Sequence, residues 1–292
     1  ANNDVELLGS TSRGIQVYFD KLCLEQADLV IPINRVKLHT DFVDTIQSGM
    51  CKMLVIGLGN HKGCSAVHEE APEVFADAIE ETARLILQKA PVGFGIAILE
   101  NAYDKTYAVE AVPAEHLVER EKELVQIAKG NMPYIMLDEA DVIVCGAIGK
   151  DISGAGFDPN ILGRSSVLKQ FVLHIPRYQR LVLCDVTPAS HGNGIGVGLF
   201  DVITKKVAEQ LDLESMYANA IACNCLGDAS VPCTVDDEET AIRVALKCCR
   251  NIDRDHPRII RIQNTLHLGE IEVSEALLDA VRADSRMSLI EN

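Results

Sequence analysis

Four residues between positions 39 and 68 could carry polar or covalent chemistry. His39, His61 and His68 are three of the eight histidines in the chain, and Lys52 lies within the apolar run 50–56. A lysine is rarely buried unless it is paired or chemically used, and a desolvated amine loses its proton and becomes a nucleophile. One interpretation is therefore a lysine prepared for covalent chemistry, with imidazoles nearby as bases or metal ligands.

A second interpretation of the same segment requires no chemistry. The stem of Lys52 could pack among apolar side chains while its charged head reaches water, and the three histidines could be unrelated loop residues. Composition alone favours this second interpretation, because surface and structural roles are the more common ones for such residues.

The order of the residues favours the first interpretation. Arg35 and His39 form an Arg-x-x-x-His pattern, Lys52 follows in a glycine-flanked segment, and His68 lies sixteen positions after the lysine. This arrangement resembles the nickel-pincer lactate racemase family of 2-hydroxyacid racemases and epimerases. Compared with the lactate-specific members, the interval between His39 and Lys52 is longer, which predicts a small loop insertion.

Further segments extend the resemblance over most of the chain. They are residues 100–102 (Glu-Asn-Ala), residues 149–152 (Gly-Lys-Asp-Ile) and the glycine-rich stretch that follows His191. These segments support the family assignment but are less specific than the pair formed by Lys52 and His68.

The resemblance implies a role for each of five residues. Lys52 would be joined covalently to a nickel-pincer nucleotide, and His68 would be the protein ligand to nickel, because one imidazole beside soft sulfur and carbon donors suits a square-planar nickel site. His39 would be one of two general bases. Arg35 and Lys150 would contact the cofactor, although Arg35 could equally orient a substrate carboxylate or form a surface salt bridge.

The implied reaction is racemisation or epimerisation of a small 2-hydroxyacid by hydride abstraction and return. A base takes the hydroxyl proton while the cofactor accepts the α-hydride, and the planar 2-oxoacid can then be reduced from either face. Cofactor-assembly enzymes are the expected protein partners, and protein made without them should lack the cofactor. The sequence leaves open whether the chain forms a homo-oligomer.

Two alternatives belong to other functional classes. One is a non-catalytic relative, or an incomplete fragment without turnover, that binds a nucleotide or a metal. The other is a dehydrogenase that uses a free nicotinamide cofactor, but the glycines at positions 192, 194, 196 and 198 do not follow the G-x-G-x-x-G spacing of a dinucleotide site. His61 has no counterpart in the lactate-specific pattern, and it could be either an extra polar contact or an exposed residue.

Two departures from the family change what is expected of the chain. The Gln and Lys that contact substrate and cofactor in lactate-specific members are missing after Ile152, so a different or larger 2-hydroxyacid is expected, held by Asn160 or Arg164. No Gly-Thr-His, the family segment that supplies the second base, occurs in the 292 residues. The chain is therefore expected to be an incomplete catalyst, with apolar residues around 29–33 or 92–99 either exposed or covered by a neighbouring chain.

Composition and length predict the fold class. With 48% hydrophobic but only 4% aromatic residues, the core must be mostly aliphatic, which suits parallel strands covered by helices. The expected fold is α/β with two domains, residues 1–132 and 133–292, mostly parallel sheets, and a site in the inter-domain cleft. The last helix is expected to pack back on the first domain.

The individual elements follow from periodicity and turn residues. Helices are expected over 17–25, 73–89, 114–129, 199–211, 238–250 and 274–284. Strands are expected over 27–33, 92–99, 109–112, 140–148, 180–186 and 258–263.

Charge and cysteine content restrict the partners and the compartment. A formal net charge of −16 argues against nucleic acid and anionic membranes, both of which would repel the chain. The ten cysteines show neither a disulfide framework nor the paired spacings of a zinc site. They are expected to be reduced in a cytoplasmic protein, and no apolar run is long enough to cross a bilayer.

Overall fold

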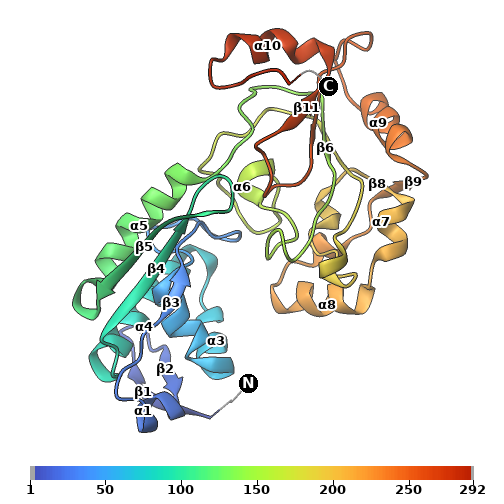
Figure 1. Ribbon diagram of the computed structural model, residues 1–292. Helices are drawn as coiled ribbons and strands as arrows, with labels where there is room; N and C mark the ends of the chain where they lie inside the picture. Colours follow the sequence, from blue (N-terminus) through green and yellow to red (C-terminus); the bar gives the residue numbers. More distant parts are fainter. Residues whose placement is uncertain (1–3, 291–292) are drawn as a thin grey trace. The chain divides into compact units, whose positions relative to one another are not determined.

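The computed structural model describes residues 4–290 and divides them into two compact units on either side of Met132 and Pro133 (Figure 1). Two expectations remain predictions. They are a site in a cleft between the units and the packing of the last helix on the first unit.

The first unit contains two small sheets. Strands β1 (Val5–Ser10) and β2 (Gln16–Asp20) form an antiparallel pair. Strands β3 (Ile33–Arg35), β4 (Phe94–Glu100) and β5 (Thr106–Pro113) form the second sheet, in the order β3-β4-β5. The pair β3-β4 is parallel and the pair β4-β5 is antiparallel, so this sheet is mixed.

Helices cover one face of the β3-β4-β5 sheet. The helices of the first unit are α1 (Lys21–Gln26), α2 (Met50–Lys52), α3 (Asn60–His68), α4 (Phe75–Lys89) and α5 (Leu117–Asn131), with a π-helix at Met53–Gly57 between α2 and α3. Burial alternates along β4, with Gly95, Ala97 and Leu99 buried. A strand with this period of two has one face towards helices and one towards solvent; here α2 and α5 pack on β4.

The opposite face of this sheet, and the chain that leads into it, expose apolar side chains. Ile33 is 53% and Val109 is 63% exposed, and Leu29 and Ile31 are exposed as well. The expectation of exposed apolar residues at 29–33 is therefore confirmed. In contrast, Val92, Ala97 and Leu99 of the second expected stretch are buried.

The second unit is built on one six-stranded sheet. Its strand order is β11-β10-β6-β7-β8-β9, and all neighbouring pairs are parallel except β10-β11. The strands are β6 (Val142–Cys145), β7 (Arg180–Leu183), β8 (Val202–Thr204), β9 (Cys233–Val235), β10 (Ile259–Ile262) and β11 (Ile271–Val273). All four residues of β6 are buried, as expected for a central parallel strand covered on both faces.

Helix α9 (Glu238–Lys247) supplies one side of the core of this unit. Its small residues Ala241 and Ala245 pack against Val142, Val144 and Val182 of the central strands. The remaining helices are α6 (Pro159–Leu162), α7 (Lys205–Gln210), α8 (Leu213–Ala222) and α10 (Leu278–Ala283).

The α/β class with a mostly parallel sheet is confirmed, whereas three expected elements are wrong. The helix expected over 17–25 is divided between β2 and α1, because residues 16–20 alternate in burial with the period of a strand. The helix expected over 199–211 contains β8, a short run of β-branched residues, and only then α7. The strand expected over 27–33 is limited to β3, preceded by a single bridge between Val30 and Val92.

Within residues 4–290, no helix is both long and apolar enough to span a membrane.

The core of the second unit predicts the effect of a cavity. Ile143 is fully buried in the central strand β6, so Ile143→Ala should lower the free energy of unfolding by about 3 kcal/mol, the usual cost of such a cavity. Ile221 on α8 is 65% exposed, and Ile221→Ala should change the free energy of unfolding by no more than about 0.5 kcal/mol. Urea titration of both variants checks this difference. Equal effects would contradict the assignment of β6 to the core.

Candidate active site in the first unit

Lys52 lies on an irregular helical segment. Helix α2 ends at Lys52, the π-helix Met53–Gly57 follows directly, and α3 begins at Asn60. A π-helix is rare and occurs often at functional sites. Gly59 makes this packing possible, because a Cβ at that position would lie 2.1 Å from the carbonyl oxygen of Val55.

A short loop holds His39 against this segment. The His39 backbone N–H donates to Gln47 Oε1 at 2.7 Å, and Gln47 Nε2 donates to the carbonyl of Asp44 at 2.9 Å. Gln47 is itself buried. The backbone N–H of Asp41 donates to His39 Nδ1 at 3.1 Å, so the loop fixes the imidazole ring as well as its backbone.

Lys52 and His39 are in direct contact, with 2.6 Å between Lys52 Nζ and His39 Nε2. Because His39 Nδ1 accepts the N–H of Asp41, the proton of the neutral ring belongs on Nε2. An Nε2–H at this distance donates to Lys52 Nζ, and only an amine, not an ammonium group, can accept it. In this tautomer the contact would require an unprotonated lysine amine, whereas in the other tautomer Nε2 would accept from an ammonium group.

The environment of His39 keeps its ring neutral. Its side chain is only 12% exposed. Burial, followed by the charges of Lys52, His68 and Lys37, lowers the pKa of His39 to about 3. The imidazole is therefore uncharged throughout the ordinary pH range.

His68 is exposed at the end of α3 and has a defined tautomer. Its Nδ1 lies 2.7 Å from the carbonyl oxygen of Cys64, one helical turn earlier. A carbonyl can only accept, so Nδ1 carries a proton, and in the neutral ring the lone pair is on Nε2. This is the arrangement in which metal-ligating histidines are held, with one ring nitrogen on a backbone carbonyl and the other on the metal.

Two phenylalanines connect the two imidazoles. His39 stacks on Phe42 with a centroid distance of 4.4 Å, Phe42 meets Phe75 edge-on at 5.2 Å, and Phe75 meets His68 at 4.9 Å. His39, Lys52 and His68 are thus brought into one region of the first unit. Their roles stay predictions.

The other two predicted residues are placed elsewhere. Arg35, at the end of β3, donates from Nη1 to Glu100 at 2.9 Å and is half exposed, which is the surface salt bridge considered from the sequence. Lys150 belongs to the second unit, beyond the carboxyl end of β6, where parallel sheets bind ligands. Its Nζ donates to the carbonyl of Gly154 at 2.7 Å and to Asn219 Oδ1.

Sequence reasoning missed several residues that build the site. Gln47 and Phe42 follow His39 in a stretch without periodicity, so nothing marked them. Phe75 was identifiable only as part of the apolar face of a helix. His61 is exposed on α3, one of the two outcomes left open for it. Asn160 is buried, and Arg164 pairs with Asp201 at 2.6 Å.

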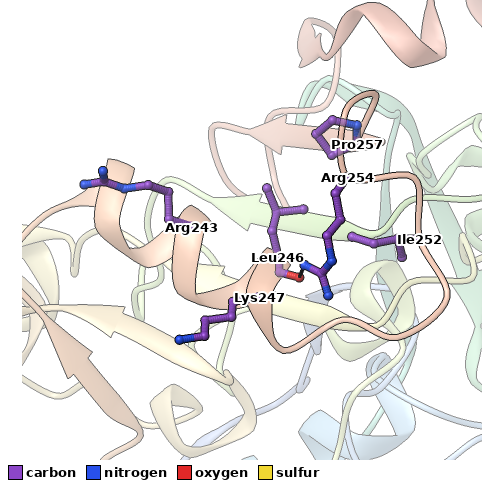
Figure 2. A pocket seen from close by; sticks show the side chains of 6 residues that line it. All are labelled: Arg243, Leu246, Lys247, Ile252, Arg254 and Pro257. Atoms are coloured by element: carbon purple, nitrogen blue, oxygen red, sulfur yellow. Dashed lines mark hydrogen bonds between the residues drawn. The ribbon is translucent and has the colours of Figure 1, made fainter.

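A separate hollow of about 190 Å³ lies on the second unit, at the end of α9 (Figure 2). It is lined by Arg243, Leu246, Lys247, Ile252, Arg254 and Pro257. The Arg254 guanidinium donates to the carbonyls of Leu246 and Cys249 at 2.9 and 3.1 Å. Arg254 therefore caps the end of the helix, and none of the predicted site residues lines this hollow.

Comparisons with known proteins give distant structural likenesses. No protein-family model matches the chain, and no curated protein matches it. A lactate racemase apoprotein from Thermoanaerobacterium thermosaccharolyticum is similar in structure, with 14% identity, a TM-score of 0.45, and coverage of 90% of this chain and 67% of that one. A crystal structure of a Thermotoga maritima protein is similar at 13% identity and a TM-score of 0.40, covering 62% of this chain and 47% of that one. Both TM-scores are below 0.5, so neither likeness determines function.

The neutral state of His39 can be observed directly. The ring nitrogen shifts of His39 in ¹⁵N NMR should stay constant between about pH 8 and pH 5, because its pKa lies well below the usual value. Nδ1 should show the shift of an unprotonated nitrogen. A titration midpoint near about 6.5, the ordinary value for histidine, would contradict the burial and the tautomer described above.

Proposed function

We propose that this chain is part of a nickel-pincer-dependent racemase or epimerase of a 2-hydroxyacid, similar to lactate racemase. The observation that supports it most strongly is the 2.6 Å contact between Lys52 Nζ and His39 Nε2. Two residues thirteen positions apart, selected from the sequence for covalent and base chemistry, are brought together by the fold.

The state of Lys52 suits covalent attachment of a cofactor. An amine forms a covalent bond only through its free lone pair, and a neutral lysine at neutral pH requires a specific environment. The tautomer of His39 that the Asp41 N–H favours would supply that environment, since Nε2–H can donate only to an unprotonated amine. A solvated surface lysine would lack this restriction.

The state of His68 suits a single metal bond. With Nδ1 on the Cys64 carbonyl, Nε2 of the neutral ring would be the nitrogen that binds a metal. The described residues include no group of three or more His, Cys, Asp or Glu side chains that could hold a metal ion. In the proposed function His68 would hold the nickel of the bound cofactor, whose soft sulfur and carbon donors suit that metal.

The residues then divide the work between them. The nickel-pincer nucleotide would supply the electrophilic carbon that accepts and returns a hydride. His39, which burial keeps neutral, would be the base for the hydroxyl proton. Arg35, with one face of its guanidinium on Glu100, and Lys150 would bind anionic groups of the cofactor.

Covalent attachment at Lys52 is tested by mass. Protein produced together with cofactor-assembly enzymes should carry added mass on the peptide that contains Lys52, and Lys52→Ala should abolish it. Lys62, which is exposed on α3 and lies over the ring of Tyr18, provides the matched control, since Lys62→Ala should keep the modification. Added mass in the Lys52→Ala variant would disprove the assignment.

Nickel content separates the roles of the two histidines. His68→Ala should lose bound nickel while the chain stays folded, because an exposed ligand contributes little to the core. His39→Ala should keep nickel, because a base is not a ligand; its loss of racemisation would be seen in a chain that also carries the second base. His61→Ala, in an exposed position on the same helix as His68, is the control and should keep nickel. Loss of nickel from His39→Ala but not from His68→Ala would reverse the roles.

A further inference from the structure

Helix α5 has one carboxyl group in its apolar face. Its buried residues include Leu117, Val118, Leu124 and Val125, and with them Glu121, which is 0% exposed. Burying a carboxyl group costs free energy unless hydrogen bonds replace its water. The contacts of Glu121 therefore require an explanation.

The carboxyl group of Glu121 is directed at the start of the segment that carries Lys52. Its Oε2 accepts the backbone N–H of Cys51 at 2.9 Å, and the backbone N–H of Met50 also interacts with it. Within the described residues, Oε1 has no hydrogen-bond partner. Glu121 thus holds the two residues that precede Lys52 in α2.

Gly49 makes this approach possible. A Cβ at position 49 would lie 2.5 Å from the carboxyl carbon of Glu121 and 2.6 Å from its Oε1, so any other residue would displace the carboxyl group. The carbonyl of Gly49 accepts a hydrogen bond from Asn34 Nδ2 at 2.8 Å. The peptide before α2 is therefore fastened from two sides, by α5 and by the start of the sheet.

Glu121 makes this contact at the expense of stability. Burial raises the pKa of Glu121 to about 7, although the N–H groups of Cys51 and Met50 act in the opposite direction. A carboxyl pKa that is raised in the folded state gives stability that is complete below the ordinary value and is lost as the pH rises towards 7. A neutral glutamine could accept the same N–H without this loss, so the acid is not explained by stability.

The charged and titratable groups around this carboxyl group are few. The Cys51 thiol lies against it, and burial together with Glu121 raises the pKa of that thiol. On α4, Glu80 and Arg84 act on Cys51, and Lys122 of α5 pairs with Glu80 at 3.0 Å. The pKa of Glu121 itself responds to burial and to its hydrogen bonds with Cys51 and Met50.

We propose that Glu121 is the positioning residue for Lys52: its buried carboxyl group fixes the first turn of the helical segment and thereby holds the lysine amine against His39. The importance of Lys52 itself rests on the proposed function. The positioning role of Glu121 does not rest on the proposed function, because it concerns the Lys52 amine before any cofactor is attached. Ionisation of Glu121 near neutral pH would change the strength of its hydrogen bonds to the backbone N–H groups of Cys51 and Met50.

The test measures the reactivity of Lys52 in the full, cofactor-free chain. Limiting acetic anhydride modifies unprotonated amines, and peptide masses give the ratio of modified Lys52 to modified Lys62. Glu121→Ala should lower this ratio about tenfold, since misplacing a reacting group costs one to two orders of magnitude. Glu121→Gln keeps an acceptor for the Cys51 N–H and should keep the ratio within about twofold. Glu123→Gln, at an exposed position of the same helix, is the control and should not change the ratio.

Two outcomes would overturn the proposal. One is an unchanged ratio in a folded Glu121→Ala protein. The other outcome comes from comparing the pH profile of the ratio in Glu121→Gln with that in the original chain, and it does not depend on folding of the alanine variant. The ratio varies with pH in both proteins because Lys62 loses its proton gradually, but only the original chain should show an additional step as the pH crosses about 7, the pKa of Glu121. Identical pH profiles would exclude positioning by this carboxyl group. Failure of the proposed function would leave both readouts intact, since neither needs nickel.

Discussion

The candidate site depends on one contact, the hydrogen bond between His39 Nε2 and Lys52 Nζ. A lysine amine in an apolar segment is unfavourable when charged, because burial penalises the ammonium form. The N–H of Asp41 favours the His39 tautomer with its proton on Nε2, and in this tautomer the ring would donate to an uncharged amine. The surrounding features serve this contact: Gln47 holds the His39 backbone, and Phe42 holds the ring.

The geometry of the lysine segment follows from the same requirement. The π-helix after Lys52 and the close packing at Gly59 give the segment a shape that a regular helix would not have. Irregular helices of this kind are stable only when the surrounding structure determines them. Here Glu121 of α5 accepts a hydrogen bond from the Cys51 N–H, and Asn34 of the sheet donates one to the Gly49 carbonyl. The aromatic series from His39 to His68 then places a second imidazole in the same region.

The sequence predicted the α/β class because its signals are local. Four consecutive apolar residues in β6 and the amphipathic period of α4 are determined by neighbours along the chain. Lys52, His39 and His68 could be selected because their types and spacing are unusual. Glu121 and Gln47 could not, because their importance arises from contacts made seventy and eight positions away. A glutamate in a charged helix has no sequence signal that it is buried. Strands β8 and β9 were missed for a related reason, since three-residue strands are formed only by pairing with the sheet.

The most direct test of this account is the protonation state of Lys52. Selective ¹³C and ¹⁵N labelling of lysine allows the Cε and Nζ signals of Lys52 to be assigned by comparison with the Lys52→Arg variant. At about pH 7, where an ordinary lysine is fully charged, the account predicts the chemical shifts of an amine for Lys52 and of ammonium groups for exposed lysines such as Lys62. An ammonium signal for Lys52, equal to that of Lys62, would contradict it.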